Sequence, residues 1–120
     1  MMKLLLTNNP LAAKKYENDL TVEYINAPLI NILTAARDCI HMGYALLTHP
    51  VSSGVKPYES PYKSVLLTGE QSRLDYESLK IIEESIAVYN KFHQAGMDLP
   101  DDLSRECMVL DLDIIKAAKN

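Results

Sequence analysis

The segment from His49 to Lys56 holds the densest group of side chains that could do chemistry. It offers an imidazole, the hydroxyls of Ser52 and Ser53, the permissive backbone of Gly54 and the ammonium of Lys56. Hydroxyls, a glycine and a lysine are the ingredients of an anion-binding loop. The paired glycines and the Gly-Lys-Ser/Thr ending of a Walker motif are missing, so the phosphate signal is weak. An ordered proline-rich loop without a ligand is the alternative interpretation.

His49 could also act as a general base near neutral pH, or recognise a ligand by hydrogen bonding. If Lys56 or Arg37 binds the charge of a substrate, the protein could be a small enzyme that uses His49 as its acid or base. No nucleophile or carboxylate stands at a recognisable spacing from His49, so we assign no catalytic residue. Arg37 has an ordinary interpretation too, because Asp38 and His41 lie within one turn of it and make a solvated or salt-bridged helix face.

A second polar group follows the first apolar run of the chain. Thr7, Asn8 and Asn9 come directly after it, and Thr48 ends another compact run. Amides and hydroxyls at strand ends can recognise a small polar ligand without supplying an acid or a base. Asn9 also has a structural interpretation as the cap of a helix that begins at Pro10. The predicted ligand-binding set is Thr7, Asn8, Asn9, Arg37, Thr48, His49, Ser52, Ser53, Gly54 and Lys56.

The cysteines and histidines, which are the usual metal ligands, do not have the spacing of a metal or cofactor site. Cys39 and Cys107 stand outside any Cys-x-x-Cys pattern, which favours two reduced, packed thiols over a zinc site or a disulfide. The histidines at positions 41, 49 and 93 lack ligand spacing. We therefore expect neither a metal nor a cofactor.

Short apolar runs and amphipathic helical patterns must position these residues. The sequence predicts strands at 3–7, 20–26, 44–48 and 64–68 and helices at 10–18, 29–42 and 72–95. Asn26 before Pro28 repeats the capping pattern of Asn9 and Pro10. Gly43 is placed to end the second helix. The apolar residues of 103–118 fit both the periodicity of a strand and that of a helix, and we favour a short strand at 106–110 followed by a terminal helix to Ala118.

This order of elements predicts a single three-layer α/β domain over residues 1–120, of the Rossmann-like or flavodoxin-like kind. We expect a mainly parallel sheet of about four or five strands with helices on both faces. The connector from 49 to 63 carries Pro50, Pro57 and Pro61, which disfavour a crossover helix, so strands 44–48 and 64–68 could pair in parallel or antiparallel. In parallel sheets, ligands bind at the carboxyl ends of the strands.

The composition limits the classes of partner that the chain can be expected to bind. The chain has 48% hydrophobic and 23% charged residues, as in an ordinary globular protein, and a net charge of -4. It lacks the basic footprint of nucleic-acid binding and the run of roughly 20 apolar residues that spans a bilayer. We therefore expect a cytoplasmic protein without nucleic-acid or membrane partners.

Three segments resemble the GrdX family, whose members are small proteins encoded in glycine, sarcosine and betaine reductase gene clusters of amino-acid-fermenting anaerobes. They are LLLTNNP from Leu4 to Pro10, RDCIHMG from Arg37 to Gly43 and LLTHPVSSGVKPYESPYKS from Leu46 to Ser64. The resemblance covers nearly the whole chain. It implies a genomic context and a cytoplasmic location, and it brings no catalytic residues.

The leading hypothesis is a non-catalytic accessory or sensing module that binds a small anion or a carboxylate metabolite. The small enzyme built on His49 is one alternative. Another is an interaction protein that forms a homodimer or binds a reductase component through the apolar stretch from Met108 to Ile115.

Overall fold

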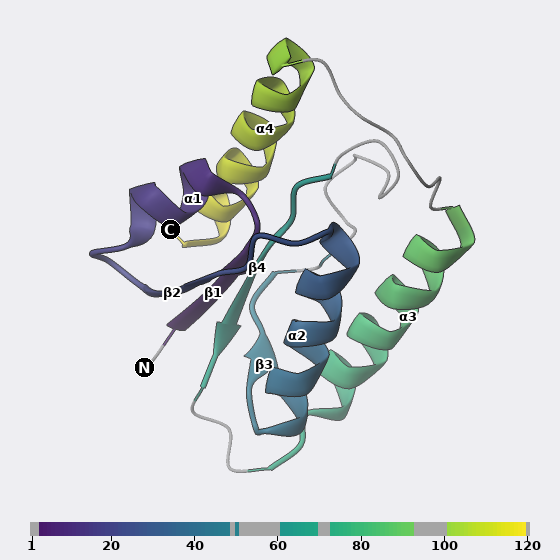
Figure 1. The fold of residues 1–120 in the computed structure, drawn as a ribbon. Helices are drawn as coiled ribbons and strands as arrows, with labels where there is room; N and C mark the ends of the chain where they lie inside the picture. Colours follow the sequence, from purple (N-terminus) through teal and green to yellow (C-terminus); the bar gives the residue numbers. More distant parts are fainter. Residues whose placement is uncertain (1–2, 49, 51–60, 70–72, 93–100, 120) are drawn as a thin grey trace.

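The computed structural model describes residues 3–48, 50, 61–69, 73–92 and 101–119. Strands and helices follow one another along the chain (Figure 1). In chain order they are β1 (Lys3–Thr7), α1 (Pro10–Tyr16), β2 (Thr21–Tyr24), α2 (Leu29–His41), β3 (Ala45–Leu46), β4 (Ser64–Thr68), α3 (Tyr76–Phe92) and α4 (Asp101–Lys119).

The strands form one mixed sheet in the order β2-β1-β4-β3. β1 and β2 are parallel, whereas β4 runs antiparallel to both of its neighbours, with Thr7 opposite Ser64 and Ala45 opposite Thr68. The expectation of a mainly parallel sheet is therefore wrong. Val65, Leu66 and Leu67 are fully buried, as predicted for a central strand. Burial on both faces does not encode strand direction, which is why the pattern of β4 misled the prediction.

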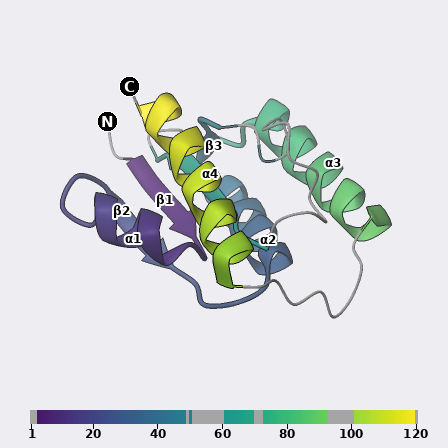
Figure 2. The same ribbon diagram turned by 90° about the horizontal axis from the view of Figure 1, so that it is seen from above.

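Helices cover both faces of the sheet, so the predicted three-layer α/β arrangement is confirmed. Leu4, Leu6, Val65 and Leu67 pack against α2 and α3 on one face. The intervening residues Leu5 and Leu66 pack against α1 and α4 on the other face. Figures 1 and 2 show α1 beside α4 and α2 beside α3 on opposite sides of the sheet.

Two helix ends follow the local signals in the sequence. The Asn9 side chain accepts a hydrogen bond from the Leu11 N–H, and Pro10 begins α1, as predicted. α2 ends in a Schellman motif, because the N–H of Gly43 donates to the Ile40 carbonyl and that of Tyr44 to the Cys39 carbonyl. Gly43 has a φ of 106°, which explains the glycine.

The start of α2 and the tail of the chain differ from the predictions. Pro28, without a side-chain cap, precedes α2, and Asn26 is exposed. Residues 106–110 belong to α4 and form no strand. The alternation of apolar residues misled the prediction, because Leu110 is 51% exposed whereas the half-buried Met108 and the buried Asp111 and Ile115 have helical spacing. Residues 93–95, expected to continue α3, lie outside the described residues.

α4 is 19 residues long, but its outer side carries charged residues. Within the described ranges, no helix has both the length and the apolar character needed to cross a membrane.

Candidate functional site: a buried polar network at the carboxyl edge of the sheet

Three strands end at the same edge of the sheet. β2 is parallel to β1, and β3, like β1, is antiparallel to β4, so β1, β2 and β3 all run in one direction. Their carboxyl ends and the amino end of β4 make what we call the carboxyl edge. Thr7, Asn8, Asn9 and Thr48 lie there, as expected. Because β4 runs the other way, Thr68 lies at the opposite edge.

A buried carboxylate joins this edge to the last helix. Asp111 of α4 is only 5% exposed and lies against the end of β1 and the start of β4. Its Oδ1 accepts a hydrogen bond from the Ser64 N–H at 2.9 Å, and its Oδ2 accepts from Ser64 Oγ at 2.5 Å and from Asn9 Nδ2 at 3.0 Å. Three donors thus satisfy a carboxylate that would otherwise be costly to bury.

The hydroxyls of Thr7 and Ser64 extend this arrangement into a chain. The Asn9 N–H donates to Thr7 Oγ1 at 2.9 Å, and Thr7 Oγ1 lies 2.7 Å from Ser64 Oγ. Because Ser64 gives its single hydroxyl hydrogen to Asp111, Thr7 must donate to Ser64. We call Thr7, Asn9, Ser64 and Asp111 the polar network. Its members hold each other in place, so each has a structural task independent of any ligand.

Asn8 connects three segments around the same edge. Its Nδ2 donates to the carbonyls of Ala27 at 3.0 Å and Pro61 at 2.9 Å, and its Oδ1 accepts from the Lys63 N–H at 2.8 Å. Both amide hydrogens are therefore used. Asn8 fixes the approach to β4 and to α2, which leaves it little capacity to donate to a ligand.

Lys63 is a second charged group that this arrangement buries. It directly precedes β4, and the residue is only 9% exposed. Burial lowers the pKa of the Lys63 ammonium below its ordinary value of 10.5, and the nearby Asp111 carboxylate opposes this shift. Among the residues that the structure describes, no carboxylate lies within ion-pair distance of this ammonium. The edge therefore holds a partly desolvated positive charge.

Sequence reasoning missed both Lys63 and Asp111. Lys63 had only a weak signal, its position directly before the apolar run of β4. Asp111 had another, because it stands three residues after Met108 and four before Ile115 on the apolar side of a helix. Reading the tail as a strand concealed that spacing.

The other predicted residues are distributed differently. Thr48 Oγ1 accepts from the Leu66 N–H at 3.1 Å and so continues the pairing of β3 with β4. Arg37 Nη1 lies 3.2 Å from Glu83 Oε1 and links α2 to α3 at the surface, away from the polar network. His49, Ser52, Ser53, Gly54 and Lys56 lie outside the described residues, so their part in a site stays a prediction.

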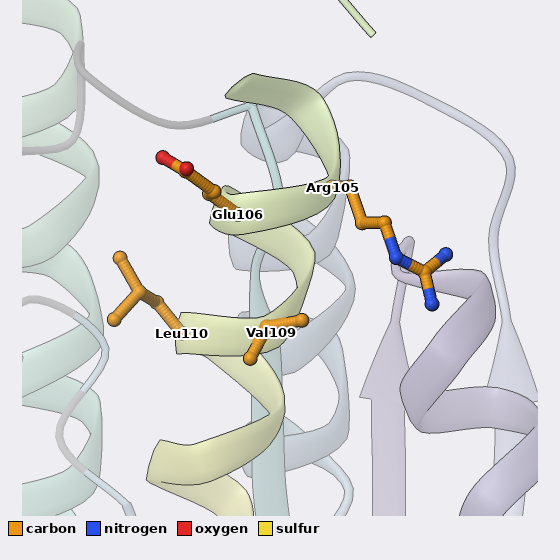
Figure 3. Close-up of a pocket in the computed structure, with 4 residues that line it drawn as sticks. All are labelled: Arg105, Glu106, Val109 and Leu110. Carbon is orange, nitrogen blue, oxygen red and sulfur yellow. The ribbon is translucent and has the colours of Figure 1, made fainter. Parts of the chain in front are cut away.

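A hollow of about 560 Å³ lies against the outer side of the same turns of α4. Arg105, Glu106, Val109 and Leu110 line it (Figure 3). Arg105 points toward the side of α1 and Leu110 to the opposite side, with Val109 between them. Val109 and Leu110 are 41% and 51% exposed. α4 therefore presents an anchoring side to the sheet and an apolar surface to the outside.

Metal binding has no candidate in the described ranges, where no three or more histidine, cysteine, aspartate or glutamate side chains form a group that could hold an ion. Cys39 and Cys107 form no disulfide, and burial raises the pKa of Cys39. The chemistry that the carboxyl edge supports is recognition by one ammonium and fixed hydrogen-bonding groups.

Comparison with known proteins agrees with the family resemblance. Searches of curated proteins and of solved structures found no significant match. The sequence model of the family described as GrdX-like protein matches residues 4–120, which is nearly the whole chain. The match includes every strand and helix except the first residue of β1. The chain therefore belongs to the GrdX-like protein family.

Proposed function

We propose that this GrdX-like chain binds a small anion, of which a carboxylate metabolite is the favoured class, at the carboxyl edge of its sheet. The observation that carries the proposal is the Lys63 ammonium, buried without a paired carboxylate among the described residues. A buried charge that no described carboxylate pairs with lowers the stability of the fold. The negative charge of a bound ligand would compensate it.

Asp111 does not remove the need for an anion. Its two oxygens already accept three hydrogen bonds from Ser64 and Asn9. The carboxylate attracts the Lys63 ammonium through space, but burial is the larger effect on the Lys63 pKa. An anion that contacts the ammonium directly would add a charge-assisted hydrogen bond.

The family context supports the carboxylate class and a link to amino-acid reductase metabolism. Glycine, sarcosine and betaine, the substrates of the reductases in whose gene clusters such proteins are encoded, each carry one carboxylate. A single buried ammonium matches a single carboxylate better than it matches a polyphosphate, which needs several donors. The role is recognition rather than catalysis, because Ser64, whose hydroxyl donates to the Asp111 carboxylate, is only 4% exposed and so is closed to a substrate.

Thermal unfolding with added ligands tests this proposal. The probes are acetate, glycine, betaine, inorganic phosphate and acetyl phosphate. A ligand at 100 times its Kd stabilises the native state by about 2.7 kcal/mol. For a chain of this size that corresponds to a rise in Tm of roughly 10 °C.

A matched pair of variants tests whether the ligand-dependent rise in Tm depends on Lys63. Lys63→Met removes the charge and keeps the length of the side chain, and should abolish the ligand-dependent rise in Tm. Lys14→Met removes an exposed lysine from α1 and should retain it. The proposal fails if none of the probes raises the Tm, or if the Lys63→Met protein responds as the wild type does.

A further inference from the structure

The outer side of α4 combines apolar exposure with a regular charge pattern. Arg105, Val109 and Asp113 follow one another at intervals of four residues, so they form one ridge along the helix. All three are exposed, and Val109 at the centre lies beside the exposed Leu110 and the hollow of about 560 Å³. Neither Arg105 nor Asp113 forms an ion pair within the described part of the chain.

This ridge is complementary to itself under a twofold rotation. Arg105 and Asp113 lie four residues before and after Val109 and carry opposite charges. If a twofold axis passes through Val109 and pairs α4 with the α4 of a second copy, each Arg105 faces the Asp113 of the other copy. Two symmetric ion pairs then flank a Val109–Val109 contact. An isologous interface requires this kind of symmetry, whereas a different partner would not.

We propose that the outer side of α4 is the interface of a homodimer in which two copies of this helix pack antiparallel about Val109. In this arrangement the second copy covers Val109, Leu110 and the adjacent hollow. The inner side of α4, which carries Asp111, stays on the sheet, so this inference is independent of anion binding at Lys63.

Charge reversal followed by light scattering tests the dimer. The wild-type protein should weigh two copies at high concentration and dissociate on dilution. Arg105→Glu alone and Asp113→Arg alone place like charges opposite each other, and each should weaken the dimer about tenfold or more. Because both pairs invert together, the double variant Arg105→Glu/Asp113→Arg should dimerise like the wild type.

Mixing the two single variants gives the sharpest result. The Glu at position 105 of one protein then faces the Arg at position 113 of the other, and the native Asp113 faces the native Arg105. An equimolar mixture should form a heterodimer at a concentration at which each protein alone is mostly monomeric. Circular dichroism of each variant establishes that the fold is intact. A wild type that stays monomeric up to about 1 mM, the range of the weakest specific complexes, overturns the proposal. So does a dimer that the single reversals leave unchanged, or a mixture that forms no heterodimer.

Discussion

Replacement of Asp111 by alanine should detach α4 from the carboxyl edge and strongly destabilise the fold. The change removes the acceptor of three buried donors, which are the Ser64 N–H, the Ser64 hydroxyl and the Asn9 amide. A buried donor left without an acceptor costs about 1 to 3 kcal/mol. Water entering the vacated space and rotation of the Ser64 hydroxyl would recover part of this, so we expect a loss of about 3 to 5 kcal/mol.

Urea unfolding followed by circular dichroism measures the loss directly. Because a domain of this kind has a total stability of about 5 to 15 kcal/mol, the change should consume a large part of it. The Tm should fall by roughly 12 to 20 °C. Asp38→Ala removes an exposed aspartate from α2 and should change stability by no more than about 0.5 kcal/mol.

A double-mutant cycle with Ser64→Ala separates the network from the loss of a side chain. The serine hydroxyl donates to Asp111 and accepts from Thr7. Its removal therefore takes away one of the donors that Asp111→Ala would leave without an acceptor. The two changes together should therefore cost less than the sum of the single changes. An Asp111→Ala protein within about 1 kcal/mol of the wild type would refute the assignment of Asp111 as the anchor of α4.

Three further changes test other features of the structure. Without ligand, Lys63→Met should raise the free energy of unfolding at pH 7 by about 1 kcal/mol or more, because it removes a desolvated charge. Between the lowered pKa of Lys63 in the folded state and the ordinary value of 10.5, the unfolded wild type binds the lysine proton and the folded wild type does not, so the stability of the wild type rises with pH. The difference in free energy of unfolding between Lys63→Met and the wild type should therefore shrink. Urea titrations from pH 7 upward measure this difference, and a constant value would contradict the prediction. Gly43→Ala should cost about 1 to 2 kcal/mol in thermal unfolding because φ is positive there, and an unchanged Tm would argue against the Schellman motif. Asn9→Ala should cost about 2 kcal/mol in the same assay, since it removes the cap of α1 and the donor to Asp111 and to the Met108 carbonyl. A loss no larger than that of an isolated cap would mean that these two bonds to α4 contribute nothing.

The parts of the fold that could be predicted are those that local chemistry dictates. Asn9 followed by Pro10 specifies a helix start through one side-chain acceptor and a ring already suited to the first turn. Gly43 specifies a helix end because other residues resist a positive φ. The buried face of α2 followed from the spacing of Leu29, Leu33 and Ala36, and all three are buried.

The features that the sequence did not reveal depend on which segments meet. Asp111 and Ser64 are 47 residues apart, and Asp111 and Asn9 are 102 apart, so no local pattern shows that a carboxylate will find its donors there. Lys63 became notable only when its side chain proved to be buried. Arg37, by contrast, pairs with Glu83 across α2 and α3, as its ordinary interpretation had allowed.

The sequence by itself determined an α/β domain with helices on both faces of a sheet, the start of α1, the end of α2, and a polar turn at Thr7–Asn9. These follow from periodicity, capping and turn chemistry, which act over a few residues. Only the tertiary structure decided that β4 runs antiparallel between β1 and β3, that α4 is one helix, and that Asp111 and Lys63 are both buried at the carboxyl edge. The reason is physical: strand direction and the pairing of distant polar groups are set by long-range burial and hydrogen bonding, and the same apolar run satisfies both directions until its neighbours are in place.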